Sequence, residues 1–283
     1  MTAARVVAMA TVAVHGGTIA WFVARGRIAR HSARFVRVNF EGREVPAVLG
    51  DALCAGAVSG LAALAVVDAV AAWVDAGRMI AAVALVTVVL WAAGRWDDLQ
   101  GDEQSRGFSG HLSAARSGRI TGGLVKLIAG GVVGLVAGAI VAEGRAIVEI
   151  GLVIALFANL LNLLDRAPGR AGKVALLTGV PMALLGSSSW AFAAIAPGGA
   201  LVACLWFDLR ATGMLGDAGA NPLGGVAGLG LAAALDEPGR VAAIAVLLVL
   251  NLASERYSFS RAIERVGVLR ALDRLGRRPS LPK

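Results

Sequence analysis

Three short motifs place carboxylate and amide side chains beside apolar segments. They are Asp97-Asp98, Asn159-Leu-Leu-Asn162-Leu-Leu-Asp165 and Gly216-Asp217-Ala-Gly219. Adjacent carboxylates can hold a divalent cation while one of them acts as a base. A glycine-rich loop lets backbone N–H groups approach a phosphate closely. Because such polar groups are costly beside hydrocarbon, the motifs favour a metal-dependent site at a membrane face.

Each motif also has a structural interpretation. Asp97 and Asp98 could be the solvated end of a helix. Asn159, Asn162 and Asp165 recur at i, i+3 and i+6, so they line one stripe that could face a cavity or form interhelical hydrogen bonds. The glycine-rich segment around Asp217 could be an ordinary turn. Only convergence of the three motifs would favour chemistry over packing.

Two basic residues are further candidates for the site. Lys126 lies early in an apolar segment, where it could hold an acidic lipid headgroup or extend toward the headgroup region. Arg210 could meet a substrate phosphate, or it could pair with nearby Asp208.

The composition indicates an integral membrane protein. The chain is 57% hydrophobic and 16% charged, which lies outside the usual range for soluble domains. Its apolar segments lack the alternating pattern of a membrane barrel, so we expect an all-α, polytopic transmembrane helical bundle with about nine spans. The expected spans are 4–24, 47–74, 79–95, 120–142, 146–164, 174–195, 198–208, 223–235 and 240–254. The seventh and eighth segments, 198–208 and 223–235, are short and could be broken or partly re-entrant.

The distribution of basic residues predicts the orientation. Of the 27 Lys and Arg residues, only Arg5, Arg78, Arg145 and Arg240 fall on one side of the predicted bundle. Positive charge is retained in the cytoplasm, so the N-terminus is expected outside and the C-terminus inside. All three motifs then lie on the cytoplasmic side. We read the first segment as a retained helix because no convincing cleavage site follows it.

Residues 1–254 are expected to form the transmembrane domain, and residues 255–283 a basic amphipathic tail. In the tail, an apolar face is marked by Phe259, Ile263, Val266, Leu269 and Leu272. The net charge is +8. The basic residues flank the predicted membrane helices, and no aromatic platform is interleaved with them. Anionic lipid headgroups are therefore the expected partner, and nucleic acid is not.

Together the motifs resemble those of the polyprenyl-phosphate N-acetylhexosamine-1-phosphate transferases. That family carries an Asp-Asp motif after its third helix, N-x-x-N-x-x-D-G-x-D-G at the inner end of its fifth, and a later G-D-x-G-S-x-x-x-G loop. The corresponding segments here begin at Asp97, Asn159 and Gly216. The resemblance extends over about 40–255 and rests on order more than on identity.

The resemblance implies transfer of a sugar 1-phosphate from a UDP-sugar to polyprenyl phosphate, with release of UMP, at a bacterial inner (plasma) membrane. It implies Mg²⁺, or alternatively Mn²⁺, with Asp217 as ligand. Asp97 and Asp98 would position or deprotonate the lipid phosphate. The expected substrate-binding residues are Asn159, Asn162, Asp165, Lys126, Gly216, Gly219 and Arg210. A homodimer is also compatible with this class.

Departures from the family pattern leave two other functions open. Arg166-Ala-Pro168-Gly169-Arg170 stands where the family continues with D-G-x-D-G, so one acid is lost and two positive charges are gained. The family's late His-rich loop is also missing. A noncatalytic relative that binds polyprenyl lipid or scaffolds envelope enzymes is therefore the first alternative. A transporter is the second, although we find no internal repeat to support it.

Overall fold

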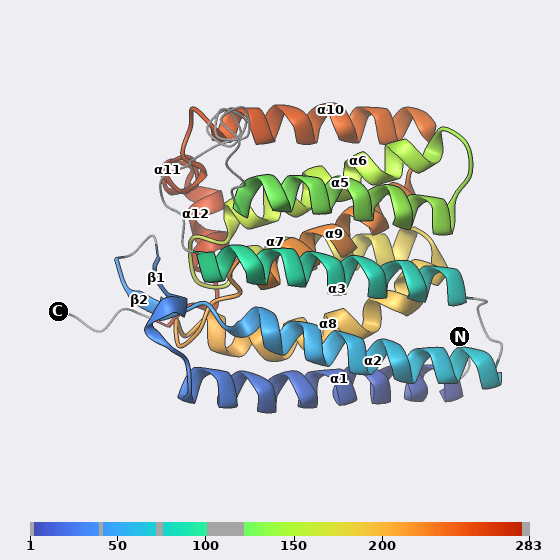
Figure 1. Ribbon diagram of the computed structural model, residues 1–283, viewed down its shortest axis with the longest axis horizontal. Helices are drawn as coiled ribbons and strands as arrows, with labels where there is room; N and C mark the ends of the chain where they lie inside the picture. Colours follow the sequence, from blue (N-terminus) through green and yellow to red (C-terminus); the bar gives the residue numbers. More distant parts are fainter. Residues whose placement is uncertain (1–2, 40–41, 72–75, 101–121, 279–283) are drawn as a thin grey trace.

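The computed structural model describes residues 3–39, 42–71, 76–100 and 122–278 of the chain. Within these ranges the protein is an all-α bundle, as predicted, with eleven α-helices. The long helices lie along a common direction (Figure 1). They are α1 (Ala3–Ala29), α2 (Leu49–Ala71), α3 (Gly77–Gln100), α5 (Gly122–Val141), α6 (Ala146–Leu164), α7 (Arg170–Leu185), α8 (Ser188–Asp208), α9 (Asp217–Ala234) and α10 (Glu237–Ser254).

Among the described residues, six helices are long and apolar enough to cross a membrane: α1, α2, α3, α6, α8 and α10. Their outer surfaces carry exposed Val, Leu and Phe side chains, as expected for helices in contact with lipid. This agrees with a multi-pass membrane protein. The count of about nine spans and the orientation of the termini stay predictions.

The glycine-rich helix α9 is continuous and longer than the expected segment 223–235, which could have been broken or partly re-entrant. Most of its residues are buried at the centre of the bundle. A Cβ atom on Gly224 would lie 2.6 Å from the carbonyl oxygen of Phe157, and one on Gly230 would lie 2.3 Å from the ring of Trp190. The glycines therefore allow close helix packing, as small residues do in membrane bundles.

The boundary between α7 and α8 also differs from the prediction. We expected helices over 174–195 and 198–208, separated near Pro197. The break instead falls at Gly186, and α8 continues through Pro197 to Asp208. The Ser187 hydroxyl accepts a hydrogen bond from the Trp190 backbone N–H at 3.4 Å, which caps the start of α8. Proline is tolerated inside helices of membrane bundles because neighbouring groups satisfy the freed backbone.

The strands β1 and β2, the turns after α6 and α8, and the C-terminal helices lie at one end of the bundle, which we call the motif end because Asp98, Asp165 and Asp217 lie there (Figure 1). A 3-10 turn, η1 (Ala33–Phe35), leads into strand β1 (Val36–Val38), which pairs antiparallel with β2 (Glu44–Pro46). Ala47 then bridges to Met214. The first connecting segment is thereby joined to the turn before α9.

The C-terminal tail forms two helices, which corrects the expectation of a single amphipathic helix. These are α11 (Phe259–Arg265) and α12 (Gly267–Arg274), and the extended backbone of Val266 separates them. The α12 helix lies crosswise to the long helices at the motif end (Figure 1). Its exposed apolar side chains are Val268, Leu269 and Leu272.

Candidate functional site

Two of the three acidic motifs meet at the ammonium group of Lys126. The Lys126 Nζ lies 2.6 Å from Asp97 Oδ2 and 2.5 Å from Asp217 Oδ2. Asp97 belongs to the last turn of α3, Asp217 begins α9, and Lys126 lies in the first turns of α5. Each of these side chains is about four-fifths buried. The structure therefore brings together predicted site residues from three separate helices.

Asp98 faces a different partner from Asp97. Its carboxylate accepts hydrogen bonds from the backbone N–H groups of Ala218 at 3.1 Å and Asp217 at 3.4 Å, at the start of α9. Its own backbone carbonyl accepts a hydrogen bond from Arg37 Nη2 at 2.6 Å. Asp98 thus satisfies the free N–H groups at a helix N-terminus, where negative charge is also favoured. The predicted catalytic pair is divided between one residue that faces Lys126 and one that positions α9.

Gly216 makes the turn into α9 possible. Its φ of 63° lies in the region that favours glycine, and an added Cβ would lie 3.1 Å from Asp98 Oδ2. The segment was expected to form a glycine-rich loop, but helix α9 already begins at Asp217. Gly219 lies in its first turn, with its N–H bonded to the Gly216 carbonyl at 3.1 Å. The motif is therefore a helix N-terminus, which corrects the loop interpretation.

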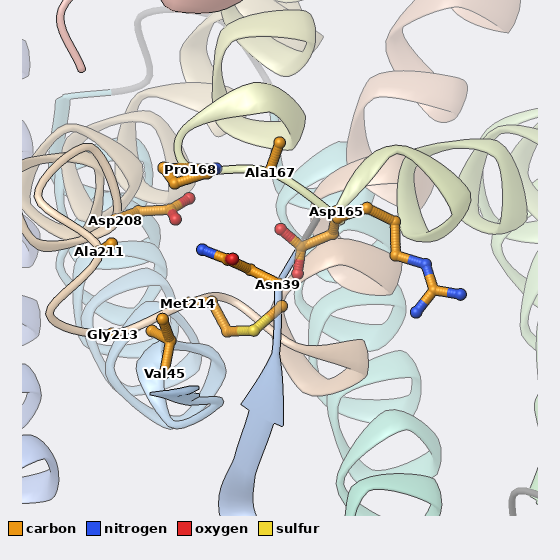
Figure 2. Close-up of a pocket in the computed structure, with 10 residues that line it drawn as sticks. Asn39, Val45, Asp165, Ala167, Pro168, Asp208, Ala211, Gly213 and Met214 are labelled. Carbon is orange, nitrogen blue, oxygen red and sulfur yellow. The ribbon is translucent and has the colours of Figure 1, made fainter. Parts of the chain in front are cut away.

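Asp165 lies directly after α6 and faces a second, smaller group of polar residues. Figure 2 shows its carboxylate and that of Asp208 turned toward each other across a cavity, with Asn39 between them. Burial raises the pKa of Asp165 well above its usual range, and the nearby charges of Asp208 and Asp217 raise it further. The backbone N–H of Gly216 bonds to the same carboxylate, so Asp165 also adjoins the turn into α9.

The two asparagines of the second motif lie farther along α6. The Asn159 amide donates to Asn251 Oδ1 at 2.6 Å, and Asn251 donates to the Leu156 carbonyl at 3.1 Å. Asn159 therefore forms a hydrogen bond between α6 and α10, as the structural interpretation of this motif expected. Asn162 is half-buried, and its backbone carbonyl accepts the N–H of Asp165 at 3.1 Å. Among the described contacts, neither amide reaches Lys126.

Arg210 pairs with neither Asp208 nor the carboxylates at Lys126. Its guanidinium lies 3.1 Å from the centre of the Trp206 ring, and its Nη1 donates to the Trp206 carbonyl at 3.0 Å. It is therefore held at the end of α8 by a cation–π contact.

A larger polar cleft adjoins the Asp165 cavity. It measures about 500 Å³ and shares Asn39 and Arg166 with that cavity. Most of its other lining residues come from the 254–261 segment, including Arg256, Tyr257 and Arg261. A cleft of this size, with guanidinium groups and one aromatic ring, can accommodate an anionic organic molecule.

Sequence reasoning missed the acidic partner of Arg170, Asp273, which fixes the loop after Asp165. Arg170, which is only 3% exposed, donates to Asp273 Oδ1 at 2.8 Å and to Asp273 Oδ2 at 2.9 Å. Its Nη1 donates to the Ser260 hydroxyl at 2.7 Å. The sequence showed the gain of positive charge at this loop, but its acidic partner is 103 residues away and follows no motif.

The donors at Lys126 suit a divalent cation such as Mg²⁺. The carboxylates of Asp97 and Asp217 approach the same point, and the positively charged ammonium of Lys126 occupies it. Proteins commonly bind Mg²⁺ through one or two carboxylates, and water and phosphate oxygens complete the coordination of the ion. Among the described residues, no group of three or more His, Cys, Asp or Glu side chains forms a ready metal site. The two carboxylates therefore fit an ion whose remaining ligands come from outside the described side chains.

Comparison with known proteins gives no family assignment, since no family model matches the chain and no curated protein matches it.

Proposed function

We propose that this protein is a phosphoglycosyl transferase of cell-envelope glycan synthesis. It would transfer a sugar 1-phosphate from a UDP-sugar to a membrane polyprenyl phosphate and release UMP. The observation that carries the proposal is the meeting of Asp97 and Asp217, from two distant motifs, at Lys126. Such an arrangement supports chemistry between two anionic phosphates, which requires positive charge at the reacting groups.

In this reaction an oxygen of polyprenyl phosphate attacks the phosphorus atom that carries the sugar. A new P–O bond forms, the bond between the two phosphates of the UDP-sugar breaks, and UMP leaves with the bonding electrons. Lys126 would neutralise the approaching phosphate, and Asp97 would accept a proton from it or orient it. Asp98 would keep α9, and with it Asp217, in position.

Asp217 and Asp97 would hold Mg²⁺ once the Lys126 ammonium moves toward a substrate phosphate. The bound ion would supply neutralisation of the diphosphate charge. The side chains of the protein would bind and orient the two substrates.

The 500 Å³ cleft is the proposed site for the UDP-sugar. Arg166, Arg256 and Arg261 offer guanidinium groups that can bind phosphate oxygens in pairs. Tyr257, which is exposed, offers a ring on which a base can stack. The cleft shares lining residues with the cavity of Asp165, which in turn adjoins the turn into α9.

We further propose that the motif end faces the cytoplasm of a bacterial inner membrane. The basic residues concentrate in the segments at that end, as positive charge does on the cytoplasmic side. Helix α12 presents Val268, Leu269 and Leu272, flanked by Arg270 and Arg274. An apolar strip beside arginines suits the surface of an anionic bilayer.

The proposal is tested by incubating purified protein in detergent with polyprenyl phosphate, MgCl₂ and a panel of UDP-sugars. We expect magnesium-dependent release of UMP from one donor, and its loss in Asp217→Asn. The matched control is Asp68→Asn, because Asp68 accepts a hydrogen bond from the Ala76 N–H away from the acidic motifs. Turnover unchanged by Asp217→Asn would refute the role of Asp217.

One observation favours a second candidate, a noncatalytic protein that binds polyprenyl lipid. Lys126 already neutralises both carboxylates, and Arg170 with Asp273 closes the loop where the family carries a further acid. Lipid binding without UMP release from any donor would select this candidate.

A further inference from the structure

A second pair of buried acids lies apart from the carboxylates that contact Lys126. Asp165 follows α6 and is 5% exposed, and Asp208 ends α8 and is 2% exposed. Both side chains turn into one cavity, as Figure 2 shows. Among the described residues, the Oδ2 atom of each carboxylate has no hydrogen-bond partner. Buried acceptors without partners are costly, so the pair requires a compensating group.

The cavity between the two carboxylates is small. Its volume is about 10 Å³ when measured by the centres of water-sized probes. Such a volume corresponds to about one water molecule or one monatomic ion. The remaining lining comes largely from the backbone turns 166–168 and 211–214, where Ala211 has a φ of 50°. A non-glycine residue in this region is strained, which is a common feature of binding turns.

The charges around the cavity indicate which kind of group could occupy it. Asp98 and Asp217 lie near enough to Asp165 to add to the negative potential there, whereas Arg277 and Lys173 lower the negative potential at Asp208. Among the described residues, Lys126 contacts Asp97 and Asp217, and Arg37 donates only to backbone carbonyls, so neither cation reaches Asp165 or Asp208. A water molecule would offer hydrogen bonds without charge, whereas a cation would also offset the negative excess. Carboxylate and backbone oxygens are the donors that Mg²⁺ and Ca²⁺ prefer.

We propose that Asp165 and Asp208 bind one divalent cation in this cavity. The ion would join the turn after α6 to the turn after α8, and so fix both turns beneath the substrate cleft. This cation site is separate from the proposed Mg²⁺ position at Asp97 and Asp217, and it does not depend on transferase activity.

Thermal unfolding followed by tryptophan fluorescence can test the site in the full-length protein in detergent. The protein is first freed of metal with a chelator and then measured with and without MgCl₂, CaCl₂ or MnCl₂ alone. Two nearly isosteric double variants separate the two positions: Asp165→Asn with Asp208→Asn, and Asp97→Asn with Asp217→Asn. Because a ligand that binds only the folded state raises its stability, we expect a rise in Tm of about 5 °C at saturating ion.

The rise should persist in the Asp97/Asp217 variant and disappear in the Asp165/Asp208 variant. Equal responses in wild type and the Asp165/Asp208 variant would overturn the proposal, as would no response in wild type. A Mn²⁺ titration followed by electron paramagnetic resonance gives a second measurement on folded protein. It should count one fewer bound ion in the Asp165/Asp208 variant. An ion response without UMP release would support this site and contradict only the transferase proposal.

Discussion

Arg170 and Asp273 form a bidentate ion pair that fastens the C-terminal helices to the loop after Asp165. Both side chains are almost fully buried, at 3% and 4% exposed. Burial alone would raise the pKa of Asp273, but Arg170 and Arg277 hold that pKa below its usual range. Arg277 also donates to the Pro168 carbonyl at 3.0 Å. The tail is thus a fixed part of the motif end and contributes Ser260 and Arg261 to the polar cleft.

Removing one partner of this pair should destabilise the protein strongly. Arg170→Ala leaves Asp273 buried with reduced compensation, and we expect a loss of about 3–5 kcal/mol in the free energy of unfolding. Replacing both residues, as in Arg170→Met with Asp273→Leu, should recover part of that loss, because the unpaired carboxylate is gone and only Arg277 then loses Asp273 as a partner. Chemical denaturation in detergent measures both values. A double variant as unstable as Arg170→Ala would contradict the ion pair as the cause.

Lys126 should matter for turnover more than for folding. In Lys126→Met the site loses the cation between Asp97 and Asp217, and we expect UMP release to fall on the order of 10²–10³-fold, as when one stabilising group is removed from a reacting charge. Added Mg²⁺ should bind more tightly in this variant, because the ammonium no longer competes for the two carboxylates.

Lys126→Arg provides the control for charge, since a guanidinium keeps the charge but has a different shape. Partial activity in Lys126→Arg together with loss in Lys126→Met would support neutralisation as the role of the residue. Full activity in Lys126→Met would remove Lys126 from the site.

Hydropathy predicted much of the bundle because long apolar segments in a bilayer have few alternatives to helices. The segment 146–164 matches α6 to the residue. The acidic motifs also gave Asp97 and Asp217 as candidates, and the position of Lys126 early in an apolar segment gave the third. The break between α7 and α8 was misplaced because Pro197 resembles a helix end in sequence, whereas the true boundary depends on Gly186 and the Ser187 cap.

Individual hydrogen-bond partners could not be predicted from sequence. Asp97 and Asp98 are neighbours, yet one faces Lys126 and the other binds the N-terminus of α9. Likewise, Asn159 reaches Asn251 across 92 residues. These partners depend on how helices are placed in three dimensions, and that information is not contained in local spacing.

Gly94 should be intolerant of a side chain because it lies against the start of α9. A Cβ on Gly94 would lie 2.3 Å from the carbonyl oxygen of Asp217, so Gly94→Ala must displace α3 or α9. We expect a loss of about 1–3 kcal/mol in the free energy of unfolding, as for other overpacked sites, together with reduced turnover. Gly131→Ala in α5 is the control, since a Cβ there meets nothing within 4 Å. That variant should gain about 0.5–1 kcal/mol from helix propensity, and equal losses in both variants would exclude the contact as the cause.

Lys173 should give the docked tail a dependence on alkaline pH. Its Nζ donates to the carbonyls of Leu272 at 3.1 Å and Leu275 at 3.2 Å, at the end of α12. Burial, together with the positive charge of Arg277, lowers the pKa of Lys173 from 10.5 to about 8. The unfolded chain therefore keeps this proton at pH values where the folded protein has released it. Stability contributed by this group should rise between about pH 8 and 10.5, since the unfolded state binds more protons there.

The comparison of wild type with Lys173→Met isolates this contribution from other groups that titrate at alkaline pH. Thermal unfolding at pH 7.5, 8.5 and 9.5 should show the Tm of wild type rising relative to that of the variant as the pH increases. Arg170 and Asp273 hold the same loop and tail together and stay charged over this range, so their contribution cancels in the difference. A difference in Tm that is constant with pH would mean that Lys173 keeps its proton when docked against α12. In that case its contacts with the helix carbonyls, and not its burial, would determine its charge.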